Sequence, residues 1–189
     1  MKKLILLAAV ACLAAVTTAR AQKVYTEGTS IVLDLSVAAG MPAGVVTTTH
    51  KVFPVPDPDI GNIQVWSKDN LESGLLNQTV YHKLEIAKSD LDAAAVHWRA
   101  AVIDCREKTI QGKTGWRLPT QRELLYMLIF KTAIVGEGAD AFANNTNYWS
   151  VTEHNGTAAY ILGLGESGYL AADGIKGSMT WRARCVREM

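Results

Sequence analysis

The chain has 189 residues, of which 49% are hydrophobic and 20% are charged, with nineteen Lys and Arg against eighteen Asp and Glu. This composition allows one sizeable buried core and excludes disordered, collagen-like and coiled-coil proteins. Because no run of like charge occurs, the chain has neither a basic patch typical of nucleic-acid binding nor an acidic tail.

Residues 1–21 have the pattern of a secretory signal peptide. Two lysines precede an apolar stretch over residues 4–16, and small residues stand at positions 19 and 21, where a signal peptidase recognises them. We therefore expect a mature chain that begins at Gln22 and is exported to the periplasm, the cell surface or the extracellular medium.

Export changes the charge of the chain and raises the question of how it is anchored. Loss of Lys2, Lys3 and Arg20 leaves sixteen basic against eighteen acidic residues, a formal charge of −2. No later segment has the roughly 20 apolar residues of a membrane span. The alternative to a soluble product is a lipid anchor on Cys12, whose preceding residues loosely resemble a lipoprotein box.

An N-terminal β-rich arm over residues 22–80 follows the signal. Ser30–Val37 has the composition of a strand, residues 53–59 are a stiff Pro-rich segment, and Asn62–Trp66 alternates as a second strand. About 60 residues hold too little apolar mass for a core of their own. We therefore expect the arm to pair with, or pack on, the domain formed by residues 81–189.

The domain begins with a strand over residues 81–87 and a first helix. Ser89 or Asp90 offers an N-cap for this helix. Apolar residues then recur at helical spacing on one face, namely Leu91, Ala95, Trp98, Val102 and Cys105.

A second helix is predicted after the glycines at 112 and 115. Pro119 and Thr120 are typical of a helix start, and Thr120 to Glu123 has the pattern of a capping box. Because residues 124–130 are apolar nearly all round, we expect this helix to be buried between layers.

Short strands separated by turn-forming residues complete the chain. They are predicted over residues 148–153, 157–164, 167–172 and 179–187. This order of elements predicts an α+β fold, with two helices packed on an antiparallel meander whose first and last strands can pair.

Two cysteines, Cys105 and Cys185, remain in the mature chain. An even number in an oxidising compartment favours a disulfide, and closing a loop of that length would stabilise by roughly 4 kcal/mol. The alternative is two separate buried thiols.

Three segments carry a further signal: Gly115–Leu124 (GWRLPTQREL), Tyr148–Glu153 (YWSVTE) and Arg184–Arg187 (RCVR). Together they resemble a bacterial family of C-type-lectin-like domains found at the ends of collagen-like and fimbrial surface proteins. The resemblance covers residues 81–189 and implies the C-type-lectin-like fold. It also implies a disulfide between the first helix and the last strand, where Cys105 and Cys185 stand.

No pattern in the chain predicts a catalytic, cofactor or metal site. Gly163–Gly168 matches G-x-G-x-x-G, but no helix is predicted after it, so a hairpin turn is favoured over a nucleotide loop. The histidines lack metal-ligand spacing; they are His50, His82, His97 and His154. His97 is expected on the surface of the first helix. The formylglycine-generating enzymes also have the C-type-lectin-like fold that the resemblance implies. The cysteine pair or histidine triad on which such enzymes depend is not found in this sequence.

Polar and aromatic residues gather over residues 144–155 and form the candidate ligand site. Tyr148 and Trp149 are expected to pack in the core. The candidate ligand-binding residues are then Asn144, Asn145, Asn147, His154 and Asn155. Three arginines of the last predicted strand are expected to form a solvated or edge-protecting stripe; they are Arg182, Arg184 and Arg187.

The sequence therefore predicts an exported, non-enzymatic surface protein that binds or adheres to a glycan or protein ligand. No cofactor, metal, nucleic acid or membrane span is expected. The second hypothesis is a structural subunit of a fimbria or surface layer, in which other subunits are partners through the arm. A third is an enzyme of the formylglycine-generating type.

Overall fold

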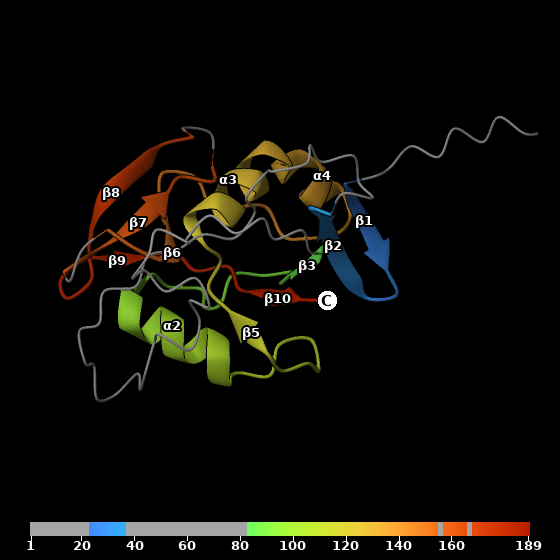
Figure 1. Ribbon diagram of the computed structural model, residues 1–189, viewed down its shortest axis with the longest axis horizontal. Coiled ribbons are helices and arrows are strands. Elements are labelled where there is room, and N and C mark those ends of the chain that lie inside the picture. The colour runs from blue at the N-terminus through green and yellow to red at the C-terminus, as the bar shows by residue number, and fades with distance from the viewer. Residues whose placement is uncertain (1–22, 37–82, 155–156, 166–167) are drawn as a thin grey trace, which may run out of the picture.

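The computed structural model describes residues 23–36, 83–154, 157–165 and 168–189 (Figure 1). The predicted signal peptide, the Pro-rich segment and the strand expected over residues 62–66 lie outside the described residues. Within the described part, the fold is mixed α+β with several antiparallel sheets. No helix there is long and apolar enough to cross a membrane.

The largest sheet has five antiparallel strands in the order β1-β2-β3-β10-β5. Their bounds are β1 Val24–Glu27, β2 Ser30–Asp34, β3 Lys83–Ile86, β10 Val186–Glu188 and β5 Trp116–Arg117. Val186 lies opposite Ile86, so the predicted pairing of first and last strands of the domain is confirmed. The described part of the arm forms the hairpin β1–β2, and β2 pairs with β3, as expected of a segment too small to bury its own core.

Helix α2, Trp98–Glu107, begins later than predicted. Neither Ser89 nor Asp90 caps it, because the Asp90 carboxylate accepts a hydrogen bond from Arg184 and the Leu91 N–H donates to the carbonyl of Ala183. The chain then forms β4, Val96–His97, which pairs with β9, Thr180–Trp181. His97 is thus the N-cap residue of α2 and its side chain makes no capping hydrogen bond. It is exposed, but it precedes the helix, whereas the prediction placed it within the helix.

Helix α3, Gln121–Ile129, begins as predicted. The capping box is confirmed: the Glu123 N–H donates to Thr120 Oγ1 at 3.2 Å, and the Thr120 N–H donates to Glu123 Oε2 at 2.7 Å. The prediction that this helix is buried on all sides is wrong, because Leu124 and Met127 are buried while Ile129 is 69% exposed. Two residues beyond Met127, Ile129 lies about 200° around the helix and so faces away from the core. An unpredicted short helix, α4 Lys131–Gly136, follows.

A second sheet has three antiparallel strands in the order β6-β7-β8. Their bounds are β6 Tyr148–Glu153, β7 Ala158–Leu162 and β8 Leu170–Ile175. The G-x-G-x-x-G segment lies between β7 and β8, which pair antiparallel, so the predicted hairpin connection is confirmed. The single strand predicted over residues 179–187 is instead divided into β9 and β10, because residues 183–185 leave the strand geometry between them.

Two apolar clusters form the core. One lies between α2 and the strands and includes Trp116, Trp149 and the disulfide, whereas the other joins α3 and α4 to β1, β2 and β3. Figure 1 shows α2 on one side of β10 and β5, and α3 with α4 on the other. Tyr148 and Trp149 are fully buried, as predicted.

The disulfide between Cys105 and Cys185 is present, with 5.7 Å between the two Cα atoms. Cys105 belongs to α2, and Cys185 directly precedes β10. The bridge therefore ties α2 to the start of β10, an interior strand of the five-stranded sheet.

Candidate functional site

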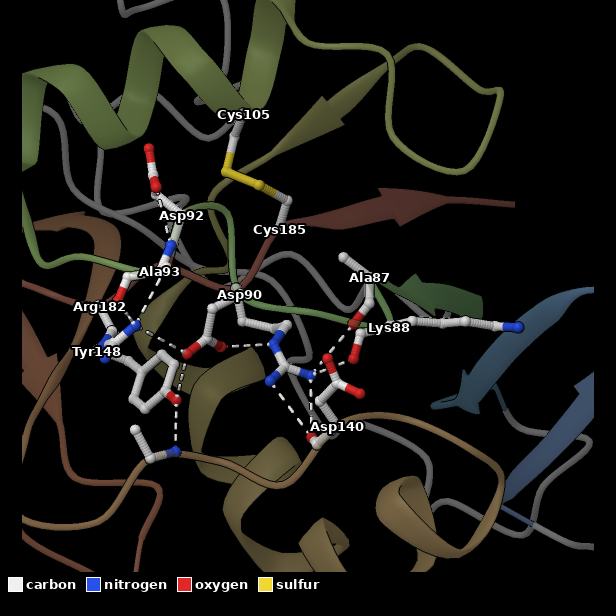
Figure 2. Close-up of polar contacts among 12 residues, drawn as sticks. Ala87, Lys88, Asp90, Asp92, Ala93, Cys105, Asp140, Tyr148, Arg182 and Cys185 are labelled. Atoms are coloured by element: carbon white, nitrogen blue, oxygen red, sulfur yellow. Dashed lines mark hydrogen bonds and ion pairs between the residues drawn. A yellow bond between two sulfur atoms is a disulfide. The ribbon is translucent and has the colours of Figure 1, made fainter.

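A fully buried arginine organises the described region that contains most of the candidate ligand residues. Arg184 is 0% exposed, and its Nε donates to Asp90 Oδ1 at 2.7 Å (Figure 2). Its Nη1 donates to the carbonyl of Lys88 at 2.9 Å, and Nη1 and Nη2 reach the carbonyl of Asp140 at 3.4 and 3.3 Å. The guanidinium also lies 4.6 Å from the ring centroid of Phe142. Because its donors are directed to these partners, the buried charge is compensated.

Asp90 connects this arginine to the start of β6. The Tyr148 hydroxyl donates to Asp90 Oδ2 at 3.0 Å and accepts from the Ala143 N–H at 2.8 Å. Burial raises the pKa of Tyr148 to about 12, and the negative charge of Asp90 acts in the same direction. The phenol therefore stays protonated near neutral pH and remains a hydrogen-bond donor.

Arg182 completes the contacts among three segments that are distant in sequence. Its Nη1 donates to the carbonyls of Asp92 and Ala93, and its backbone N–H donates to the carbonyl of Asn147 at 2.9 Å. The Asp140 N–H donates to the carbonyl of Lys88 at 2.8 Å. We call residues 88–93, 139–147 and 182–184, held together in this way, the loop platform (Figure 2).

The loop platform brings three of the candidate ligand residues together. Asn144 and Asn145 are exposed and Asn147 is half-buried. Asn145 has a φ of 55°, in the left-handed region that asparagine tolerates better than most residues. A Cβ placed on Gly165 would lie 2.8 Å from Asn144 Oδ1, so the loop packs closely against this glycine.

The other candidates are not part of this group. His154 follows β6 at its far end, seven residues after Asn147, which corresponds to roughly 20 Å along a strand. It is exposed, and its ring meets that of Tyr160 edge to face at 5.5 Å. Asn155, like His50 and His82, lies outside the described residues.

The arginine stripe predicted on the last strand is wrong. Arg184 is fully buried rather than solvated, and β10 lies between β3 and β5, so no sheet edge is protected there. Arg187 contacts Glu85, with 2.9 Å from its Nε to Oε2, and Arg182 donates to the carbonyls of Asp92 and Ala93 within the loop platform. Each arginine is therefore held by partners that come from distant parts of the chain.

Further buried carboxylates of the described residues are paired with cations. Glu85 accepts from Lys113 Nζ at 2.6 Å, and Glu123 forms a two-pronged pair with Arg117 at 2.7 and 2.8 Å. Burial by itself would raise the pKa of Glu85, but hydrogen bonds from Lys113 and Arg187 outweigh burial and lower it. Burial would lower the pKa of Arg117, whereas Glu123 raises it more strongly. These pairs connect strands and a helix start, which is a structural role.

The loop platform presents hydrogen-bonding groups on a fixed backbone. Asp92, Asp140, Asn144 and Asn145 are all exposed, so the loop platform presents amides, which donate and accept, and carboxylates, which accept. Such a set suits hydroxyl or peptide groups. Among the described residues, no group of three His, Cys, Asp or Glu side chains could hold a metal ion.

Local patterns in the sequence do not predict the residues that build the loop platform. They indicate a surface stripe for Arg184 and a helix cap for Asp90, whereas the two residues pair with each other across 94 positions of sequence. Asp92 and Asp140 carried no local signal. The Asn-rich composition of residues 144–147 was the signal that located the exposed part.

Comparison with known proteins does not assign the chain to a family. No family model matches the chain, and no curated protein matches it significantly.

Proposed function

We propose that the protein is exported and non-catalytic, and that residues 81–189 form a C-type-lectin-like domain. In this proposal the domain binds a glycan or protein ligand at the bacterial surface, and the loop platform is its binding site. Export is supported by the signal-peptide pattern of residues 1–21.

Three observations support the fold assignment. Strands β3 and β10 pair, two longer helices start at Trp98 and Gln121, and the disulfide joins α2 to the residue before β10. The Trp-Arg-Leu-Pro-Thr segment that begins α3 supports the same assignment.

One observation carries the choice of site: buried Arg184 hydrogen-bonds to two other segments, residues 88–93 and 139–147, and polar side chains on both of these segments are exposed. A rigid backbone loses little entropy when a ligand binds, so a pre-organised loop set binds better than a mobile one. Asn144 and Asp140 supply directional hydrogen bonds to hydroxyl or amide groups of a ligand.

The test is an array of glycans and matrix proteins probed with the mature chain, residues 22–189. The double variant Asp140→Ala/Asn144→Ala should lose at least tenfold in affinity for whichever ligand binds. The matched control is Glu107→Ala, an exposed carboxylate at the end of α2, which should bind like the parent. Equal binding by all three proteins would contradict the site, and turnover of a substrate without any binding would contradict the function.

A glycine variant tests the geometry of the loop without removing a ligand group. In Gly165→Ala, the new Cβ would lie 2.8 Å from Asn144 Oδ1 and 2.9 Å from the carbonyl of Ala143, so the loop must shift. Binding should fall, whereas Gly136→Ala, with open space around its Cβ, should bind normally. If Gly165→Ala binds like the parent, the position of the loop does not matter for recognition.

A further inference from the structure

Strand β8 is the outer strand of the three-stranded sheet and lies at the periphery of the molecule (Figure 1). At its start, the Gly163 N–H donates to the carbonyl of Tyr169 at 2.6 Å. Hydrogen-bonded and non-hydrogen-bonded pairs alternate along an antiparallel ladder. The next pair, Leu170 opposite Leu162, is therefore non-hydrogen-bonded, and Leu170 directs its N–H and C=O away from β7.

The other end of β8 has the same arrangement. The Lys176 N–H donates to the carbonyl of Thr157 at 3.0 Å, so Ile175, which lies opposite Ala158, also directs its N–H and C=O away from β7. The Ile175 N–H reaches Sδ of Met179 at 3.4 Å, and a thioether is a weak acceptor. A backbone carbonyl would be a stronger partner for this amide.

The opposite edge of the same sheet is closed by the chain itself. On β6, the Trp149 N–H donates to the carbonyl of Arg182 at 2.9 Å, and the Val151 N–H donates to the carbonyl of Pro119 at 2.8 Å. Natural proteins usually protect an open edge strand with charged residues or proline. Residues 170–175 contain one charged residue and no proline, so β8 has the character of an edge that accepts another strand.

Two exposed aliphatic side chains lie on one face of β8, at its two ends. Leu170 is 41% exposed and Ile175 is 45% exposed. Their partners on β7, Leu162 and Ala158, are four positions apart and so share a face of the sheet. Leu162 packs in the cluster that contains Leu124 of α3. Both exposed side chains are therefore on the face that α3 packs against, and the helix leaves them uncovered.

We propose that β8 pairs antiparallel with β8 of a second copy of this chain, so that the two three-stranded sheets become one continuous sheet. Antiparallel pairing about a two-fold axis puts the start of each strand beside the end of the other. Leu170 then covers Ile175 of the partner subunit on the same face, and the Ile175 N–H gains the Leu170 carbonyl of the partner subunit as acceptor. This self-complementarity favours a second copy over an unrelated segment. Pairing through β8 is independent of ligand binding at the loop platform.

Leu170→Lys tests the contact between the two copies. Sedimentation velocity of the parent, residues 22–189, should show monomers that convert to dimers as the concentration rises. The variant should raise the dissociation constant of the dimer by about tenfold or more, because each copy would bury an ammonium group against an aliphatic side chain. The matched control is Val135→Lys, at an exposed apolar residue of α4, which should dimerise like the parent.

Amide hydrogen exchange of the parent locates the interface without any substitution. The Leu170 N–H points away from β7 in the single chain and is bonded in the dimer, so its exchange should slow as the concentration rises. The Ala171 N–H, in the pair that Ala171 forms with Ile161 within one chain, should exchange at the same rate throughout.

Three results would each overturn the proposal: a parent that stays monomeric, a Leu170→Lys variant that dimerises like the parent, or exchange at the Leu170 amide that does not change with concentration. Because exchange is measured on the parent, it remains decisive even if the lysine variant folds poorly.

Discussion

At the scale of single residues, the charged groups that lie buried in the described part of the chain are surrounded by partners. Arg184 is completely buried, yet Asp90, backbone carbonyls and the ring of Phe142 surround its guanidinium. Removing one partner of such a pair leaves an uncompensated charge, which typically costs about 3–5 kcal/mol. Substitution of Arg184, which organises the candidate site, should therefore also lower the stability of the fold.

Trp149 is the residue whose loss should destabilise the fold without acting on the ligand directly. It is 0% exposed, and its Nε1 donates to the carbonyl of Val96 at 2.7 Å. We expect Trp149→Ala to lower the free energy of unfolding by roughly 3–5 kcal/mol in urea titrations. Tyr169→Ala, at a side chain 53% exposed, should change it little.

Binding measured on the same variants separates the two roles of an aromatic residue. Should Trp149→Ala unfold like the parent while binding is lost, the ring belongs to the recognition surface and its burial is not its main role.

At the scale of elements, Glu85 connects parts of the fold that are far apart in sequence. This β3 residue is fully buried and accepts from Lys113 Nζ at 2.6 Å and from Arg187 Nη2 at 2.5 Å. Lys113 in turn reaches Ser30 of β2, and Arg187 belongs to β10. One carboxylate therefore joins three strands of the five-stranded sheet to the turn at residues 110–113.

This connection should make stability depend on acid pH. The folded-state pKa of Glu85 is lowered below its ordinary value of 4.5 because Lys113 and Arg187 outweigh burial. Its contribution is fully present above pH 4.5 and is lost as the pH falls through the lower folded-state pKa. Urea unfolding across this range should show falling stability for the parent.

Glu85→Gln isolates the contribution of this group. The variant should be less stable than the parent at neutral pH and should lose less on acidification, whereas Glu107→Gln, at an exposed position, should follow the parent. An acid slope in Glu85→Gln equal to that of the parent would refute the assignment.

At the scale of the whole molecule, the disulfide joins helix α2 to the start of β10, an interior strand of the main sheet. Cys105 and Cys185 are both 0% exposed and 80 positions apart. Such a bridge mainly restricts the unfolded chain. It also precedes β10 directly, so it holds the strand that pairs with both β3 and β5.

Loss of the bridge should be visible as a change in the stability of a protein comprising residues 22–189. Cys105→Ala/Cys185→Ala should lower the free energy of unfolding by about 2–5 kcal/mol, as for native bridges of small secreted domains. Peptide mapping without reductant, on protein isolated from its native compartment, should give one linked pair. Two free thiols in that preparation would contradict both the bridge and its role.

Contiguous residues were enough to predict the elements whose signals are local. The capping box of α3 is formed by Thr120 and Glu123, three positions apart, so its pattern is visible in the sequence. The bounds of β6, Tyr148–Glu153, coincide with those predicted, because turn-forming residues delimit this strand. The cysteine count, together with the predicted signal peptide, was enough to predict the bridge.

The tertiary structure alone decided what depends on residues far apart. Asp90 has the local features of a helix cap, but its carboxylate gains more from a buried guanidinium 94 positions away, so α2 starts only at Trp98. For the same reason Asn144 and Asn145 belong to a platform that also includes Asp92, while His154 lies at the other end of β6. Periodicity and capping patterns reflect interactions between residues that are close in sequence. A site is instead formed by segments that are far apart in sequence and that come together only when the chain folds.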